Sequence, residues 1–336
     1  MPREKPPTVR LRDLDQGQFA DCFARLVERK PSTTSAGKPY FLCRFRDGER
    51  VAAYMVWNDG PHFTECEQNW QVGKVYKLRV NYSEHDKYGP QITVQQIREL
   101  NDADKADGFD PLQFVERSRR EPDEIFADLR SLVEMEIADE PLRKLVLLIL
   151  DRNADRVRWL PGSINKYYPF AGGWLEHTLS VTRSCLHLAD KYRALYPELT
   201  PPINRDLLAS GAILHDIGRT AEIDDPLAMQ STVPGELIGH LLLGRDIVRD
   251  AARDIPDLNP ELLQLLEHLI ITHLNLPAWG SPRLPLIPES LILHHADDLD
   301  AKVEMYVRCL TRDAAAGPFT ERDPILGRHL FKGRKV

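Results

Sequence analysis

The sequence predicts a multi-domain protein in which an all-β barrel is followed by an all-α helical bundle. The chain has 336 residues, and a typical domain has about 100–200. Residues 8 to about 100 form short runs typical of strands, whereas from Asp123 onward apolar residues recur at the i, i+3, i+4 and i+7 spacing of helices. Hydrophobic residues make up 42% of the chain and charged residues 28%, which is typical of globular proteins and argues against a disordered or fibrous chain.

Turn signals separate about five strand-like segments in residues 1–100. The clearest signal is Asp47-Gly48, which lies between two alternating runs, because glycine tolerates the positive φ of a hairpin turn. Five strands in so short a stretch favour a small closed barrel, and the OB-fold is the most common five-stranded choice. We therefore predict an OB-fold-like domain over residues 1–100.

Residues 101–122 are polar and contain two prolines, which predicts a linker. The segments EIFADLRSLVEMEI and EPLRKLVLLILDRN then open a helical domain that we expect to cover residues 123–315. Residues 316–336 are basic and lack periodicity, so we predict a C-terminal tail there.

The net charge is −7, which excludes a uniformly basic surface that would coat nucleic acid non-specifically. The charge is unevenly distributed. Residues 1–100 contain 16 Lys and Arg against 13 Asp and Glu, a net charge of +3, so the remaining residues carry −10. A local basic surface on the barrel is therefore compatible with the acidic total.

The cysteines and apolar segments predict a reduced, cytoplasmic protein. The N-terminus MPREKPPTVR has no apolar stretch typical of a secretory signal. The longest apolar run is LVLLIL at 145–150, whereas a membrane-spanning helix needs about 20 residues. No CxxC pair occurs, so we expect neither a disulfide framework nor a thiolate zinc site from the five cysteines, Cys22, Cys43, Cys66, Cys185 and Cys309.

The histidines indicate the chemistry, because nine of the eleven lie at or after His177. His215 and Asp216 are adjacent and follow the apolar run 207–214, which predicts a buried helix. An ionised Asp there is costly unless something compensates its charge. A divalent cation would do so, since imidazole nitrogen and carboxylate oxygen are ligands that transition metals accept. Further His and Asp residues are spread over about 120 residues, and such distant ligands converge only in a helical bundle.

The order His…His-Asp…Asp resembles the signature of the HD-domain metal-dependent phosphohydrolases. The segments GGWLEHTLS, GAILHDIGR, GELIGH and LHHADDLDAK, with a segment ending WGSPRLP, also resemble the YhaM-type 3′-to-5′ exoribonucleases. Those proteins carry an OB-fold ahead of the HD domain. The resemblance covers roughly residues 8–310, including the order of the two domains, and it implies that the helical bundle is an HD domain and that the barrel binds nucleic acid.

The resemblance implies one or two divalent metal ions, Mn²⁺ above all, with Co²⁺, Fe²⁺, Mg²⁺ or Zn²⁺ as alternatives. Where the family usually has His-His-Gly, this chain has His273-Leu274-Asn275, which leaves the occupancy of a second metal position open. The implied ligands are His177, His215, Asp216, His240, His273 and Asp297.

The implied reaction is hydrolysis of a phosphodiester in single-stranded RNA, or DNA, with nucleoside 5′-monophosphates as products. His215 and Asp216 are the catalytic pair, and Arg219 and Lys302 are suited to hold phosphate oxygens.

Several neighbouring residues are expected to play supporting roles. Adjacent residues of a helix point about 100° apart, and the resemblance favours Asp297 over Asp298 as the ligand. Asp300 is expected to cap or to orient a ligand, and His268 and His294 to have structural or supporting roles. Glu176 could polarise water or, equally, be a first-turn helix charge.

On the barrel, period-2 alternation places Phe41 and Phe45 in the core and opposite side chains on the surface. Exposed aromatics on OB barrels stack on bases, and nearby cations contact the backbone. The predicted nucleic-acid contacts are Tyr40, Arg44, Arg46, Tyr82 and Lys87.

Two other functions remain open from the sequence. The helical domain alone is compatible with a nucleotide or cyclic-dinucleotide phosphohydrolase, although a small substrate needs no barrel. The chain could instead be a non-catalytic adaptor that binds single strands, an interpretation supported only by Leu274. We expect no membrane partner, and the sequence leaves the oligomeric state open.

Overall fold

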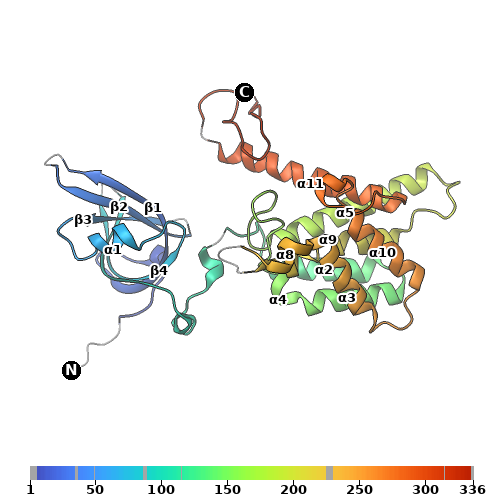
Figure 1. Cartoon of the computed structure of the whole chain (residues 1–336), viewed down its shortest axis with the longest axis horizontal. Coiled ribbons are helices and arrows are strands. Elements are labelled where there is room, and N and C mark those ends of the chain that lie inside the picture. Colours follow the sequence, from blue (N-terminus) through green and yellow to red (C-terminus); the bar gives the residue numbers. More distant parts are fainter. Residues whose placement is uncertain are drawn as a thin grey trace. The chain divides into compact units, whose positions relative to one another are not determined.

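The computed structural model describes residues 6–34, 37–48, 50–85, 89–114, 116–224, 230–313 and 315–333. The chain divides into two compact units, residues 1–114 and 115–336. Figure 1 shows strands in the first unit (blue to cyan) and helices in the second (green to red). The predicted fold class, a β-barrel followed by a helical domain, is confirmed.

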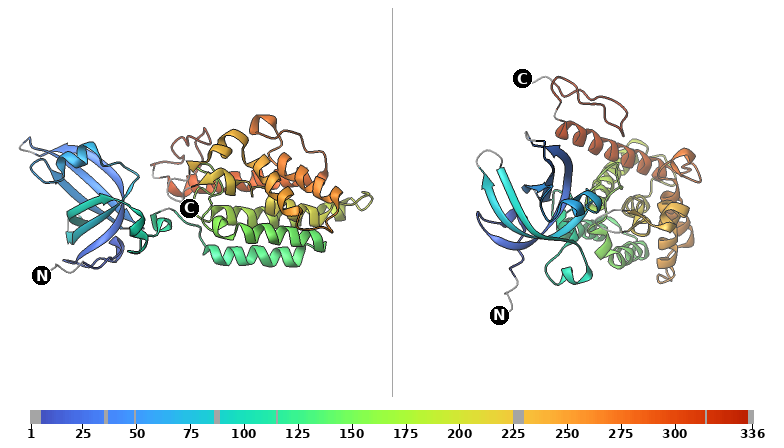
Figure 2. Two further views of the ribbon diagram at one scale, coloured as in Figure 1. Left: turned by 60° about the horizontal axis from the view of Figure 1, so that its bottom comes forward. Right: turned by 60° about the vertical axis from the view of Figure 1, so that its left-hand side comes forward.

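Five strands form the closed barrel of the first unit, and Figure 2 shows them curving around a common centre. Their order is β1-β2-β3-β5-β4, and antiparallel pairing of β1 with β4 closes the barrel. This order is compatible with an OB-fold. The elements are β1 (Phe19–Thr33), β2 (Pro39–Asp47), β3 (Arg50–Trp57), α1 (Phe63–Gln68), β4 (Val75–His85) and β5 (Gly89–Glu99), preceded by the 3-10 helix η1 (Leu11–Asp13).

Alternation along the strands decides which side chains fill the barrel. On β2, Cys43 and Phe45 are fully buried while Arg44 and Arg46 are exposed, and Phe41 is partly buried against the same core. The alternation on β2 therefore directs Phe41 and Phe45 toward the core and leaves Arg44 and Arg46 on the surface, as the sequence predicts.

Part of the predicted linker packs on the barrel. It contains the 3-10 helices η2 (Asp102–Lys105) and η3 (Pro111–Phe114). Asp104 is fully buried there and accepts hydrogen bonds from Lys77 Nζ at 3.1 Å and Arg98 Nη1 at 2.8 Å. These contacts tie the segment to β4 and β5, so the division between the units falls after residue 114 rather than at residue 100.

The second unit is a bundle of helices around one large apolar core. α5 packs against both α6 and α11. No helix in the described ranges has the length and apolarity needed to cross a membrane. The helices are α2 (Pro122–Glu136), α3 (Glu140–Arg152), α4 (Ala154–Val157), α5 (Gly173–Leu195), α6 (Arg205–Leu214), α7 (Arg219–Glu222), α8 (Val233–Ile238), α9 (His240–Ala252), α10 (Pro260–Thr272) and α11 (Pro288–Arg312).

Short elements connect these helices. The strands β6 (Ile223–Asp224) and β7 (Gln230–Ser231) pair between α7 and α8, and the 3-10 helix η4 (Pro277–Trp279) lies between α10 and α11. Asn204 and Asn259 accept backbone N–H bonds at the starts of α6 and α10, which satisfies donors that a helix start leaves free.

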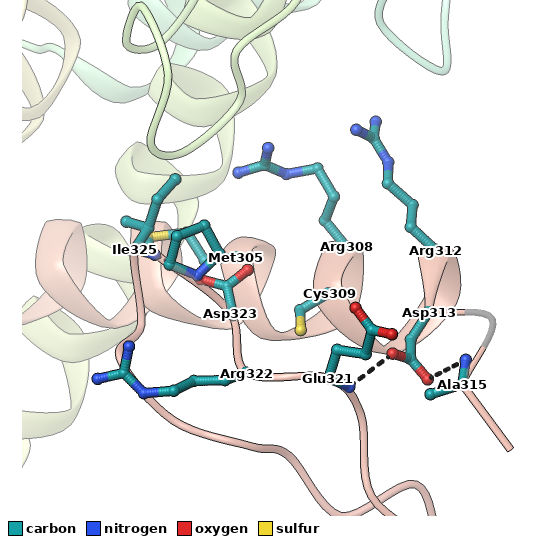
Figure 3. A pocket seen from close by; sticks show the side chains of 11 residues that line it. Met305, Arg308, Cys309, Arg312, Asp313, Ala315, Glu321, Arg322, Asp323 and Ile325 are labelled. Atoms are coloured by element: carbon teal, nitrogen blue, oxygen red, sulfur yellow. Dashed lines mark hydrogen bonds between the residues drawn. The ribbon is translucent and has the colours of Figure 1, made fainter.

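Residues 316–333 of the predicted basic tail fold back against the end of α11. Asp313 accepts hydrogen bonds from the backbone N–H of Ala315 and Glu321, drawn in Figure 3, and pairs with Lys332 at 2.6 Å. Met305 and Cys309 of α11 and the returning segment line a pocket of about 500 Å³. The segment is therefore packed in this structure without forming a helix.

Candidate metal centre

The ends of several helices bring the six predicted ligands to one place. His177 lies in the first turns of α5, and His240 is the first residue of α9. His215 and Asp216 follow the last residue of α6 directly, and His273 follows the last residue of α10. Asp297, which lies within α11, completes the cluster. Ligands separated by 120 residues thus converge because helix termini meet at the centre of the bundle.

One group of three potential ligands consists of His177, His215 and Asp297. Their ligand atoms all lie within 4.8 Å of one another. His177 Nε2 is 3.1 Å from Asp297 Oδ1 and 3.4 Å from His215 Nε2. All three side chains are buried. The group therefore has the nitrogen and oxygen donors and the spacing that a divalent transition metal requires.

A second group shares a residue with the first and consists of His215, Asp216 and His273, again within 4.8 Å. Asp216 Oδ1 lies 3.7 Å from His273 Nε2 and 3.4 Å from His240 Nε2. His240 thus adds a fourth side chain to this group.

Within the described residues, three buried polar atoms of the second group have no hydrogen-bond partner: Asp216 Oδ1, His240 Nε2 and His273 Nε2. Buried polar atoms in folded proteins nearly always have a partner, and an unpaired one costs free energy. A divalent cation among them would satisfy all three at once. The side chains of the second group therefore fit a metal ion.

Each of the four histidines uses Nδ1 in a hydrogen bond outside the cluster. The acceptors are carbonyl or carboxylate oxygens, so Nδ1 carries the proton of the neutral ring. Nε2 then has no proton and faces the site with its lone pair. Asp300, expected to orient a ligand, does so for His177. The acceptors, at 2.7–3.2 Å, are Asp300 for His177, Ala212 for His215, Glu222 for His240 and Ile270 for His273.

Residues 174–302 match the family model of the HD domain. The helical unit contains an HD domain. All six predicted ligands lie within the matched residues, and the HD domain indicates a metal-dependent phosphohydrolase. The matched segment lies wholly within the second unit.

The pKa values of two HD-domain histidines are shifted in opposite directions. Burial lowers the pKa of His177, but hydrogen bonds to Asp297 and Asp300 outweigh burial and raise it to about 10. Burial lowers the pKa of His215 to about 4 despite nearby Asp216. Without metal, His177 therefore holds a proton between two carboxylates, whereas His215 is neutral and ready to bind a metal.

Arg219, predicted to hold phosphate, is fixed by three groups within the HD domain. Its Nε donates to Asp216 Oδ2 at 2.8 Å, Nη1 to Glu222 Oε2 at 2.9 Å and Nη2 to the Tyr167 hydroxyl at 2.8 Å. Although burial raises the pKa of Asp216, Arg219 and His215 outweigh it and hold that pKa well below the usual range. Of the five guanidinium N–H groups, two remain for a substrate oxygen.

Tyr167 is a site residue that the sequence interpretation did not include. Its hydroxyl donates to Asp216 Oδ2 at 3.1 Å and accepts from Arg219, and its ring centre lies 4.9 Å from that of His177. The residue belongs to the irregular segment between α4 and α5, where neither helix nor strand periodicity operates. The only sequence signal is the pair Tyr167-Tyr168 shortly before α5.

Lys302 lies on α11 outside the cluster. It is five residues after Asp297, about 140° further round the helix. Its side chain is 56% exposed and its ammonium pairs with Asp298 at 2.7 Å. Asp298 is therefore a surface partner of Lys302, and the structure does not bring Lys302 to the ligands.

Other histidines and Glu176 have supporting positions. His294 Nδ1 donates to the backbone carbonyl of ligand His273 at 2.7 Å, as a supporting residue would. His268 Nε2 accepts from the backbone of Leu286, a structural contact. Glu176 binds Arg119 through its carboxylate and is thus used in an ion pair, not directed at the ligands.

Of the predicted nucleic-acid contacts on the barrel, Arg44 and Arg46 are exposed, and Tyr40 is half-buried with its ring centre 5.0 Å from that of Trp57. The prediction for Tyr82 is wrong, because this side chain is only 2% exposed. Alternation on β4 places Tyr82 on the same inward face as other core residues. Lys87 lies outside the described residues.

Proposed function

We propose that this protein is a metal-dependent exoribonuclease that shortens single-stranded RNA from its 3′ end and releases nucleoside 5′-monophosphates. The observation that carries the proposal is an OB-compatible five-stranded barrel in the same chain as an HD domain in which the six predicted ligands lie together. A barrel of this kind is a common platform for single strands, whereas hydrolysis of a small nucleotide needs no such platform.

Aromatic and basic side chains on the barrel support a nucleic-acid role. The rings of Tyr40 and Trp57 lie together across β2 and β3, and 41% of Trp57 is exposed. Arg44 and Arg46 alternate with buried residues on the same strand. Bases stack on exposed rings while cations contact the phosphates, and this mode tolerates any base sequence. DNA is the alternative polymer, and both are included in the test below.

The chemistry follows from the buried ligands. A bound divalent metal supplies activated water near neutral pH and neutralises a phosphate oxygen; we expect Mn²⁺ here. The Nε2 atoms of the histidines and the oxygens of Asp216 and Asp297 would hold it. Arg219 keeps Asp216 ionised, and its two remaining N–H groups suit a phosphate oxygen as charge accumulates.

The ligand set favours an enzyme over an adaptor with a structural HD domain. Leu274 replaces the second His of the family motif, yet Asn275 keeps the tight turn, with φ +64°, that ends the His273 segment. Asn adopts this left-handed conformation more readily than most residues. The buried atoms around Asp216 that have no partner in the described part of the chain support a functional site.

Separating the two units tests the proposal. We expect a chain starting at residue 115 to bind single-stranded RNA at least tenfold more weakly, while it still hydrolyses a small phosphodiester such as bis(p-nitrophenyl) phosphate with Mn²⁺. The second unit has its own apolar core, so we expect this shorter chain to fold, and circular dichroism would confirm its helical content. Full-length protein with Arg44→Ala and Arg46→Ala is the matched control and should show the same selective loss in milder form. Equal losses on RNA, DNA and the small substrate would contradict the division of roles.

A further inference from the structure

Trp279 is a half-exposed aromatic residue in the segment between α10 and α11. It ends the 3-10 helix η4, and 49% of the residue is exposed. Gly280 follows with φ +107°, a backbone conformation that residues with a side chain rarely adopt. The chain therefore turns sharply directly after the indole. The turn fixes the position of a large flat ring that the apolar core of the HD domain does not cover.

A cation beside this ring connects it to one metal ligand. Lys302 Nζ lies 5.8 Å from the centre of the Trp279 ring. The same ammonium pairs with Asp298, the residue that follows the ligand Asp297 on α11. The ring and the positive charge thus lie together on the surface, on the side of α11 that carries Asp298.

Two further contacts place Trp279 near other ligands. The ring centre of His294 is 6.2 Å from that of Trp279, and His294 donates to the carbonyl of the ligand His273. A Cβ built on Gly280 would lie 3.9 Å from the side chain of Leu241, which follows the ligand His240. His294 is therefore one hydrogen bond from the ligand His273, and Leu241 is the residue next to the ligand His240.

We propose that Trp279 stacks against the nucleobase attached to the phosphate that the metal centre attacks. The proposal rests on the proposed function and names the part of the substrate that the HD domain itself recognises. The site combines a flat π surface, an ammonium that pairs with Asp298 and a cluster of predicted metal ligands, and a nucleotide has the matching parts, an aromatic base and an anionic phosphate. Stacking accepts every base because each has a π face, so the site would hold successive 3′ nucleotides without regard to sequence.

Binding of two small probes tests this contact in the full-length protein loaded with Mn²⁺. The probes are adenosine 5′-monophosphate and ribose 5-phosphate, which lacks the base, and calorimetry gives the Kd of each. We expect wild-type protein to prefer the base-containing probe. Trp279→Leu should weaken binding of that probe about 5- to 150-fold and leave ribose 5-phosphate unchanged. Trp279→Phe, which keeps a stacking ring, should retain most of the preference.

Leu286→Ala is the control, because Leu286 lies in the same segment and is 78% exposed; it should change neither Kd. Equal Kd values for the two probes in wild-type protein, or equal weakening of both by Trp279→Leu, would overturn the proposal. The readout does not require cleavage. If the protein leaves RNA uncut but shows the Trp279-dependent preference, the exoribonuclease proposal is contradicted and the stacking site is supported. If the protein cleaves RNA but lacks that preference, the exoribonuclease proposal is supported and the stacking site is contradicted.

Discussion

At Asp216 the two carboxylate oxygens have different partners, and this difference explains how the residue can bind a metal. Oδ2 accepts from Arg219 Nε and from the Tyr167 hydroxyl. Oδ1 faces His240 and His273 and has no hydrogen-bond partner among the residues that the structure describes. Bonds to Oδ2 fix the plane of the carboxylate, so Oδ1 is held toward the metal position. Groups that orient a ligand in this way commonly change metal affinity when they are removed.

Replacement of Tyr167 by Phe tests this arrangement. The change removes one bond to Asp216 and one acceptor for Arg219, while the ring beside His177 stays. We expect Mn²⁺ affinity to fall about tenfold or more, measured by metal titration of the metal-free protein, with little change in the midpoint of thermal unfolding. Tyr192→Phe is the control, since the Tyr192 hydroxyl has no hydrogen bond within the described residues. Unchanged metal affinity in Tyr167→Phe would show that the Tyr167 hydroxyl does not orient Asp216.

Sequence patterns identify some site residues and miss others, and the difference has physical reasons. Ligands such as His177 and Asp297 could be assigned because they lie on periodic helices in a recognisable order. Tyr167 could not, because its segment has no periodicity and its contacts form only in the folded chain. Tyr82 was misassigned because alternation fixes two faces of a strand but not which face is buried until the barrel closes.

At the scale of elements, close packing of α7 on α9 positions His240. A Cβ added to Gly218 would lie 1.9 Å from the carbonyl oxygen of His240 and 2.5 Å from the backbone nitrogen of Gly244. No side chain fits there, so α9 can approach α7 only because residue 218 is glycine. This approach brings the His240 ring within reach of Asp216.

Gly218→Ala should therefore act on both stability and metal binding. We expect a loss of about 3 kcal/mol in the free energy of unfolding, since backbone must move to admit the methyl group, and weaker metal binding as His240 is displaced. Urea unfolding and metal titration measure the two effects. Gly244→Ala is the milder control: its Cβ would meet Gly218 N at 3.2 Å, within a helix that favours Ala. If Gly218→Ala had the unfolding free energy and metal affinity of the wild-type protein, the close packing of α7 on α9 would not depend on glycine at residue 218.

At the scale of the whole molecule, the two parts of the chain differ in charge as they differ in fold. The first 100 residues carry +3 and the remainder −10. The order of barrel and helical bundle was predictable because strand and helix patterns occupy separate stretches. Their boundary was not, because the polar residues 101–114 resemble a linker and yet pack through Asp104, whose charge is buried against Lys77 and Arg98.

Product analysis on single-stranded RNA labelled at its 5′ end tests the central claim most directly. With Mn²⁺, Co²⁺, Fe²⁺, Mg²⁺ or Zn²⁺ in parallel, we predict progressive shortening from the 3′ end and nucleoside 5′-monophosphates as products. A chelator, or Asp216→Asn in a folded protein, should reduce the rate at least about 100-fold. RNA that stays full-length with every metal, or shortening that persists with the chelator or in Asp216→Asn, would contradict the assignment of this HD domain as a metal-dependent exoribonuclease.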